Sequence, residues 1–70
     1  MYYRILWEEN GEDAAEEVNT KEEAKKKVKE IDQNPNACAA EDVIVIMVGR
    51  VRYDIAYGDR IDEMQCDSDD

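Results

Sequence analysis

The first residues alternate between two sets of side chains in the way typical of a β-strand. In residues 2–8, Tyr3, Ile5 and Trp7 fall on one side of an extended chain, because successive side chains of a strand point to opposite faces. The pattern predicts a strand over residues 2–8 that turns these three side chains toward a core.

A tight turn is predicted next, at Asn10 and Gly11, because both residues tolerate the positive φ angles of a type I′ hairpin. Folding back there makes residues 12–18 a second strand and places Arg4 opposite Glu17. Near the turn, however, acidic residues would face one another, and residues 12–18 are poor strand formers. A loop or a short helix over this segment remains an alternative.

A capping box predicts a helix that begins after Thr20. The Thr20 hydroxyl can accept the backbone N–H of Glu23, and the Glu23 side chain can reach back to residue 20. A narrow apolar stripe follows at helical spacing: Ala24, Val28 and Ile31. Pro35 and its flanking asparagines end the helix.

Residues 42–57 predict a second hairpin around Gly49-Arg50, with glycine at the first position of a type II′ turn. This turn pairs Val48 with Val51, Ile46 with Tyr53, and Ile44 with Ile55. All six side chains, with Tyr57, then share one face, and we predict that this face packs against the helix. The opposite face of the hairpin would point away from the helix.

Together these elements predict an α+β fold, a small single domain with one antiparallel sheet and one helix on one face. The order is ββαββ, or βαββ if residues 12–18 do not pair. We expect the domain to cover residues 1–58 and residues 59–70 to form an acidic, partly disordered C-terminal tail. Within that tail, Ile61 and Met64 are spaced to pack as one helical turn.

The charge balance limits the kinds of partner. The 70 residues include 19 acidic and 9 basic side chains, a net charge of −10. Nucleic acid and anionic membranes repel such a chain, so we expect it to bind neither and to favour a basic protein surface. The two cysteines lie far apart, and no segment is typical of a signal peptide or a membrane span, so we expect a cytoplasmic location.

The residues that catalysis requires are mostly missing. The sequence has no histidine, so neither Ser68 nor a cysteine has its usual activating base. Two cysteines alone cannot complete a zinc site, and Asp59, Asp62 and Glu63 lack the spacing of a calcium loop. We therefore expect no enzymatic activity, no catalytic residues, no metal and no cofactor.

Acidic residues on and after the first strand are the first candidate binding site. They are Glu8, Glu9, Glu12, Asp13, Glu16 and Glu17. Carboxylates held on a sheet edge can imitate the regular charge of a nucleic-acid backbone and occupy a basic groove. The alternative is that they only keep the protein soluble and protect the sheet edge from aggregation.

The sheet face away from the helix is the second candidate, because one helix cannot cover both faces. Its predicted partner-binding residues are Tyr2, Leu6, Val43, Val45 and Met47. An exposed apolar patch of this kind favours a protein contact or a homodimer. The alternative is that the tail folds over this face through Ile61 and Met64.

Small size, strong acidity and the missing catalytic set give the chain a general resemblance to small inhibitor proteins of phages and mobile elements, including anti-CRISPR proteins. This resemblance is one of size and charge and assigns no residue roles. It implies a non-enzymatic protein-binding module, a nucleic-acid mimic that blocks a basic DNA- or RNA-acting host protein. The alternative function is a structural or assembly protein that homodimerises through its exposed sheet face.

Overall fold

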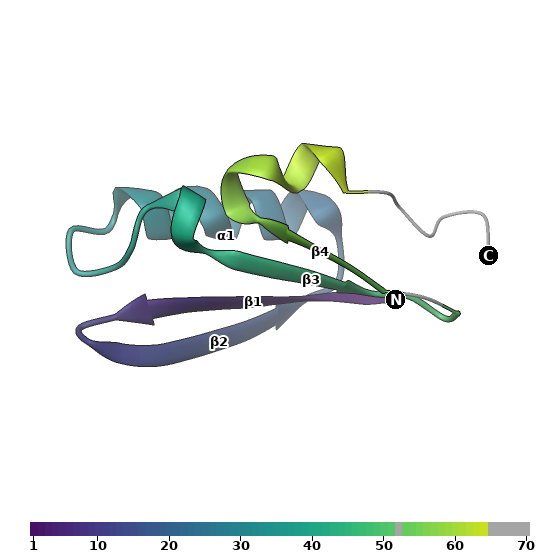
Figure 1. The fold of residues 1–70 in the computed structure, drawn as a ribbon, viewed down its shortest axis with the longest axis horizontal. Helices are drawn as coiled ribbons and strands as arrows, with labels where there is room; N and C mark the ends of the chain where they lie inside the picture. Colours follow the sequence, from purple (N-terminus) through teal and green to yellow (C-terminus); the bar gives the residue numbers. More distant parts are fainter. Residues whose placement is uncertain (52, 65–70) are drawn as a thin grey trace.

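A four-stranded antiparallel sheet and one α-helix make up the fold (Figure 1). The computed structural model describes residues 1–51 and 53–64. In chain order the elements are β1 (Tyr2–Glu9), β2 (Glu12–Val18), α1 (Lys21–Gln33), the 3-10 helix η1 (Ala40–Asp42), β3 (Ile44–Val48), β4 (Tyr53–Tyr57) and the 3-10 helix η2 (Gly58–Glu63). The strands lie in the order β2-β1-β3-β4, which confirms the α+β class and the ββαββ order. Residues 65–70 of the predicted tail, Cys66 and Ser68 included, lie outside the described residues.

The hairpin of β1 and β2 forms as the turn chemistry predicts. Asn10 and Gly11 adopt φ angles of 55° and 79°, the left-handed values that a type I′ turn requires. The register places Trp7 opposite Ala14, and Arg4 opposite Glu17. The loop and the short helix considered for residues 12–18 are therefore wrong. The tight turn fixes the strand pairing despite the poor strand propensity of an acidic segment.

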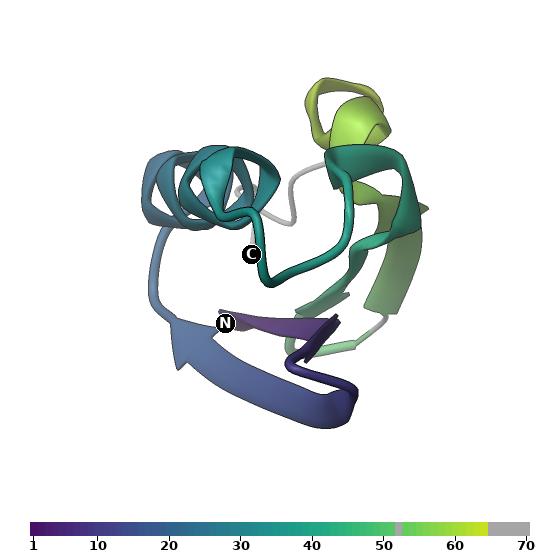
Figure 2. The same ribbon diagram turned by 90° about the vertical axis from the view of Figure 1, so that its left-hand side faces the viewer.

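Helix α1 begins and packs as predicted. The Thr20 hydroxyl accepts the backbone N–H of Glu23 at 3.1 Å, and the Glu23 carboxylate accepts the backbone N–H of Asn19 at 3.3 Å. The predicted stripe of Ala24, Val28 and Ile31 is buried. Figure 2 shows α1, η1 and η2 on the same side of a sheet that curves around them. We call this side of the sheet the inner face and the other side the outer face.

The inner face of β3 is the opposite of the predicted one. Val43, Val45 and Met47, which we expected on the exposed face, are completely buried in the core at 0% exposure. The reason is the pairing of β3 with β1, in which Tyr3 lies opposite Met47 and Ile5 opposite Val45. Residues opposite each other share a face, so the buried side chains of β1 set the buried side chains of β3.

The connection between β3 and β4 is also longer than predicted. Val48 pairs with Tyr53, so four residues rather than two separate the strands. The predicted pairs Ile46–Tyr53 and Ile44–Ile55 are wrong, and the observed partner of Ile46 is Ile55. A shift of two residues keeps each side chain on the same side of the hairpin. The expected grouping on one face is therefore confirmed for the residues within the strands, although that face points away from the helix. Val51, predicted to pair with Val48, lies in the loop instead.

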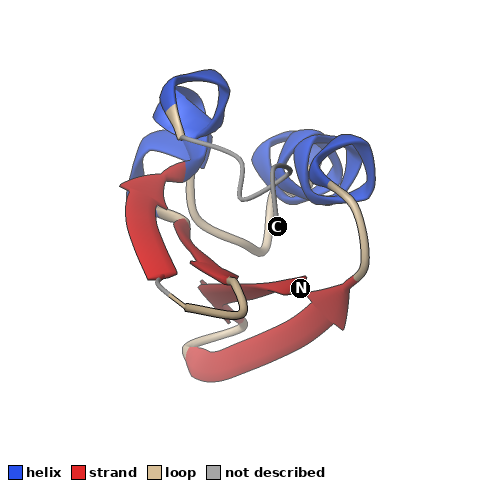
Figure 3. Ribbon diagram, turned by 90° about the vertical axis from the view of Figure 1, so that its right-hand side faces the viewer, coloured by secondary structure: helices blue, strands red, loops and turns tan. Residues whose placement is uncertain are grey.

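The segment after β4 completes the core on the inner face. Ile61 and Met64 are 4% and 5% exposed, and both belong to the same cluster of buried residues as the stripe of α1. The helical turn expected around them forms as η2, beside α1 in Figure 3. The alternative in which they cover the outer face is therefore wrong. An ion pair of 2.7 Å between Lys25 and Asp62 joins α1 to η2.

Candidate protein-interaction surface

Apolar side chains of three neighbouring strands lie together on the outer face. The register aligns them in rows across β1, β3 and β4: Leu6, Ile44 and Tyr57 in the first row, Arg4, Ile46 and Ile55 in the second, and Tyr2, Val48 and Tyr53 in the third. We call Leu6, Ile44, Ile46, Tyr53, Ile55 and Tyr57 the outer patch. The residues from β4 are the most exposed, at 68% for Tyr53, 56% for Ile55 and 58% for Tyr57.

Only part of the predicted sheet-face site lies on this surface. Tyr2 and Leu6 are half-buried on the outer face, as their alternation along β1 predicts. The other three predicted residues are in the core, as described above. Sequence reasoning missed the contribution of β3 and β4 to the outer patch, because it assigned those side chains to the core. Tyr53 and Tyr57, at the two ends of β4, were a sequence signal that this side of the strand faces water, because the tyrosine hydroxyl tolerates contact with water.

The six candidate acidic residues do not form one continuous surface. Strand alternation places Glu8, Asp13 and Glu17 on the outer face, and Glu9, Glu12 and Glu16 on the inner side of the hairpin. The pairing of Glu8 with Asp13 and of Glu9 with Glu12 determines which acids of the two strands share a face. The acidic run is therefore divided between the two faces of the hairpin.

Several acids of the hairpin already have partners. Glu17 forms an ion pair of 2.8 Å with Arg4, and Glu16 lies 3.4 Å from Lys27. The Glu9 carboxylate accepts a hydrogen bond of 3.1 Å from the indole N–H of Trp7. Glu8, Glu12 and Asp13 form no side-chain hydrogen bond or ion pair with the described residues, and they lie next to the turn that closes the hairpin.

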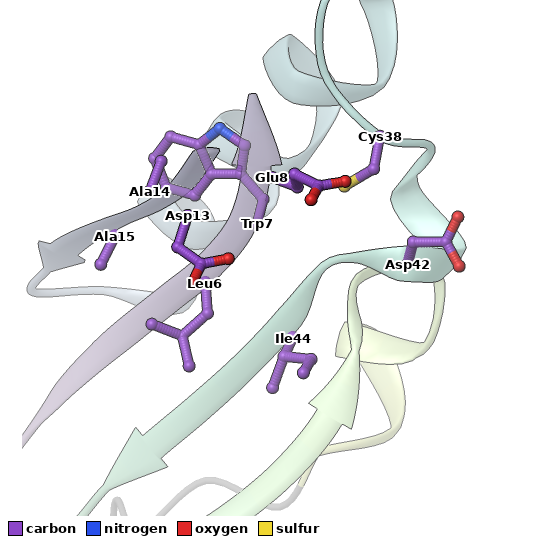
Figure 4. Close-up of a pocket in the computed structure, with 9 residues that line it drawn as sticks. All are labelled: Leu6, Trp7, Glu8, Asp13, Ala14, Ala15, Cys38, Asp42 and Ile44. Carbon is purple, nitrogen blue, oxygen red and sulfur yellow. The ribbon is translucent and has the colours of Figure 1, made fainter. Parts of the chain in front are cut away.

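A hollow of about 610 Å³ lies where the acidic hairpin meets the outer patch (Figure 4). Leu6 and Ile44, which are opposite each other in the sheet, provide its apolar floor. Glu8, Asp13 and Asp42 also line it, and Figure 4 shows the Asp42 carboxylate turned outward from the other residues. The hollow can therefore receive a side chain that is apolar along its length and positively charged at its end.

The connection from α1 to β3 closes one side of this hollow. The backbone N–H of Cys38 donates to the carbonyl oxygen of Glu8 at 3.2 Å, and that of Asn10 donates to the carbonyl oxygen of Asn36 at 2.8 Å. These bonds continue the pairing of β1 beyond the end of β3. They bring Cys38 and Asp42 to the hollow, although both residues are distant from β1 in sequence.

Two basic side chains of α1, Lys25 and Lys27, form ion pairs with acids on the inner side of the sheet. A hydrogen bond from Lys25, together with its positive charge, lowers the pKa of Asp62 below its ordinary value, and the same contact raises the pKa of Lys25. The Lys27 ammonium lies 5.1 Å from the centre of the Trp7 ring, a cation–π contact. These contacts tie the helix to the rest of the fold.

Within residues 1–51 and 53–64, no three Cys, Asp or Glu side chains are placed to hold a metal ion together. In the same ranges, no helix combines the length and apolar character needed to cross a membrane. In comparisons with known proteins, the chain matches no family model, no curated protein and no solved structure.

Proposed function

We propose that this protein is a non-enzymatic protein-binding module that occupies a basic surface of a nucleic-acid-binding protein. It acts as a polyanion mimic, in the manner of the small phage-type and anti-CRISPR inhibitors. The observation that supports this proposal is the group of three carboxylates beside the hairpin turn, Glu8 and Asp13 on the outer face and Glu12 on the inner side, without ion-pair partners among the described residues, in a chain of net charge −10.

The physical reason is electrostatic attraction that is not cancelled within the molecule. Exposed carboxylates without internal partners attract a basic surface and raise the rate of encounter. The type I′ turn fixes the end of the hairpin, so these charges are held in place before binding. A cytoplasmic partner that handles DNA or RNA offers the matching positive groove.

Capture of the partner from a lysate of the native cells, followed by competition, tests the proposal. We expect the captured protein to dissociate steeply as salt rises above about 0.15 M, because exposed charges are then screened within about 8 Å. Duplex DNA or RNA should displace the captured protein, since the nucleic acid would occupy the same groove of that protein. A partner that resists both salt and nucleic acid would contradict the mimic.

A matched pair of variants tests where the charge acts. Changing Glu8, Glu12 and Asp13 to lysine should abolish binding, mainly through slower association. The control changes three exposed acids elsewhere to lysine: Glu30, Glu41 and Asp59. Both variants have the same net charge, so only a local role of the hairpin separates them. Equal loss of binding in both would show that net charge alone matters.

A second candidate function is self-assembly through the outer patch, favoured by the exposure of Tyr53, Ile55 and Tyr57 on strand β4. Size-exclusion chromatography with light scattering tests it. A dimer that persists in high salt and is lost on Ile55→Asp would support assembly, whereas a monomer at every concentration would contradict it.

A further inference from the structure

The outer face joins two chemically different halves. The half on β3 and β4 presents apolar and aromatic side chains, and the half on β1 and β2 presents the carboxylates of Glu8, Asp13 and Glu17 beside Leu6. They meet at the hollow, where Leu6 and Ile44 lie beside Glu8 and Asp13. A partner that covers this face therefore contacts both halves at once.

The outer face of a second copy of this chain does not match the charged half. Arg4 is the only basic residue within the four strands, and it is already paired with Glu17 at 2.8 Å. A second outer face would bring further carboxylates toward Glu8, Asp13 and Asp42, and like charges at an interface oppose association. Charge complementarity therefore selects a different protein with basic side chains.

The free edge of the sheet is also protected against addition of another strand. The backbone N–H of Ile55, in the middle of β4, donates to the carboxylate of Asp54 at 3.0 Å. A pairing strand would need that N–H group for its own ladder. This contact favours docking on the outer face over pairing along the edge of β4.

From these observations we infer that the outer patch docks a partner surface whose apolar centre is bordered on one side by lysine or arginine. The apolar centre packs on Ile46, Ile55 and Tyr53. The basic border lies over the hollow, where the carbon stem of a long side chain packs on Leu6 and Ile44 and its charged end meets the carboxylates. This inference rests on the proposed function and adds that the partner contributes apolar contacts as well as positive charge.

Synthetic amphipathic helices serve as defined probes. The first has a leucine face bordered by arginine. The second keeps the leucines and replaces the arginines with glutamate, and the third keeps the arginines and replaces the leucines with serine. Amide chemical-shift changes in the isotope-labelled protein report where each one binds, and titration gives the dissociation constant.

We expect the leucine–arginine helix to shift the amides of the outer patch, Ile44 and Ile55 included. The leucine–glutamate helix should not bind, and the serine–arginine helix should bind about tenfold more weakly, a difference that corresponds to partial burial of one large apolar side chain. Equal affinity of the two arginine helices would overturn the inference, as would shifts confined to the hairpin and α1.

The variant Ile55→Asp separates apolar docking from simple attraction. It adds a negative charge, so purely electrostatic binding of the leucine–arginine helix would become tighter, whereas docking on the patch should weaken about tenfold. Val51→Asp adds the same charge in the loop before β4, where Val51 is 81% exposed, and should not weaken binding. The pair Tyr53→Thr and Ile55→Thr keeps strand propensity and should weaken binding in the same way.

The two hypotheses fail in different patterns. If the hairpin reversals abolish binding of the captured partner and Ile55→Asp changes nothing, the proposed function stands and the docking inference is wrong. If Ile55→Asp abolishes binding and the hairpin reversals change nothing, the basic partner is wrong and the proposed function fails. A wild-type dimer that Ile55→Asp dissociates would mean that a second copy occupies the patch, against the inference.

Discussion

The two hairpins of the sheet expose opposite chemistry on the same outer face. The hairpin of β1 and β2 closes through a two-residue turn and presents Glu8, Asp13 and Glu17 outward. The hairpin of β3 and β4 closes through a four-residue loop and presents isoleucine and tyrosine outward. On the inner side both hairpins reach the core, through Tyr3 and Ile5 of β1 and Val45 and Met47 of β3, whereas β2 has no residue buried to that degree.

This difference shows how so small a domain divides its apolar residues. Strand β3 is central in the sheet, so its inner side must be apolar, while its outer side is free to serve another purpose. Strand β2 is an edge that contributes little to the core, and charges there discourage pairing with other chains. The apolar outer side of β3 and β4 is thus the part of the sheet that its own core does not need.

The largest expected effect comes from placing a charge on either side of the second hairpin. Val45→Asp puts an unpaired carboxylate where the side chain is completely buried, and it should lower the free energy of unfolding by several kcal/mol. Ile55→Asp, at an exposed position of the neighbouring strand, should cost about 1 kcal/mol or less, within the range of strand propensities. Thermal unfolding followed by circular dichroism measures both. Equal melting temperatures for the two variants would refute the assignment of inner and outer sides.

The first hairpin could be predicted from sequence because its turn admits few registers. Asn10-Gly11 fixes the strand ends, and every observed pair from Tyr3–Val18 to Glu9–Glu12 follows by counting back from that turn. The helix was equally accessible, because a capping box and a buried stripe both point to the same boundaries. Local signals that act within a few residues of the turn or the cap were sufficient in both cases.

The second hairpin could not be assigned in this way, because both sides of β3 are apolar. Ile44, Ile46 and Val48 alternate with Val45 and Met47, so hydrophobicity does not distinguish inside from outside. The deciding contact is the pairing with β1, which joins residues about forty positions apart. Buried Ile61 and Met64 also complete the inner face from beyond β4, so the core needed less from β4 than predicted.

The outer face and its hollow could be predicted from the sequence only where they depend on β1 and β2. Their alternation correctly placed Tyr2 and Leu6 on the outer face. The hollow depends on Cys38 and Asp42, which reach β1 through backbone bonds of the connection after α1. No periodic pattern in that connection indicates such a contact.

Two glycines, one from each half of the molecule, provide the next comparison. A β-carbon at Gly58 would lie 2.6 Å from the carbonyl oxygen of Ala40 and 2.7 Å from a methyl carbon of Val28, so Gly58→Ala should cost about 3 kcal/mol through overpacking. At Gly11 nothing lies within 4 Å, and Gly11→Ala should cost only the strain of its positive φ, about 1 kcal/mol. Denaturant unfolding at equal protein concentration measures the difference. A larger loss for Gly11→Ala would mean that the second hairpin is not closely packed against α1 and η1.

The two edge strands differ in how they resist pairing, and matched substitutions test this difference. Asp54→Ala removes the carboxylate that accepts the Ile55 N–H at the free edge of β4, next to exposed apolar side chains. We expect weak, concentration-dependent self-association in sedimentation velocity experiments. Asp13→Ala removes the same charge from the β2 edge, where the neighbouring side chains are acidic, and should remain monomeric. Similar behaviour of both variants would show that net charge, rather than the local edge contact, prevents association.

The smallest expected effect concerns the ion pairs that connect α1 to the two halves of the molecule. Lys27 approaches Glu16 on β2 at 3.4 Å, and Lys25 contacts Asp62 on η2 at 2.7 Å. For the second pair, the hydrogen bond and positive charge of Lys25 hold the pKa of Asp62 below 3.8, its value in the unfolded chain. A carboxyl whose pKa is depressed on folding adds stability above its unfolded value and loses it as the pH falls through the folded value. The raised pKa of Lys25 sets the other limit, because its contribution is present below 10.5 and disappears at higher pH.

Asp62→Asn should therefore lower the melting temperature slightly at neutral pH, because both side chains are largely exposed and such pairs are weak. The difference from wild type should shrink as the pH falls below 3.8 and disappear once the pH has passed the lower pKa of the folded protein, where Asp62 of the wild type is protonated as well. Asp59→Asn, on the same turn without a side-chain partner among the described residues, is the control and should follow the wild-type curve at every pH. Melting curves of the three proteins from neutral to acidic pH provide the measurement. A deficit of Asp62→Asn that persists in acid would mean that the carboxylate charge is not what holds η2 against the helix.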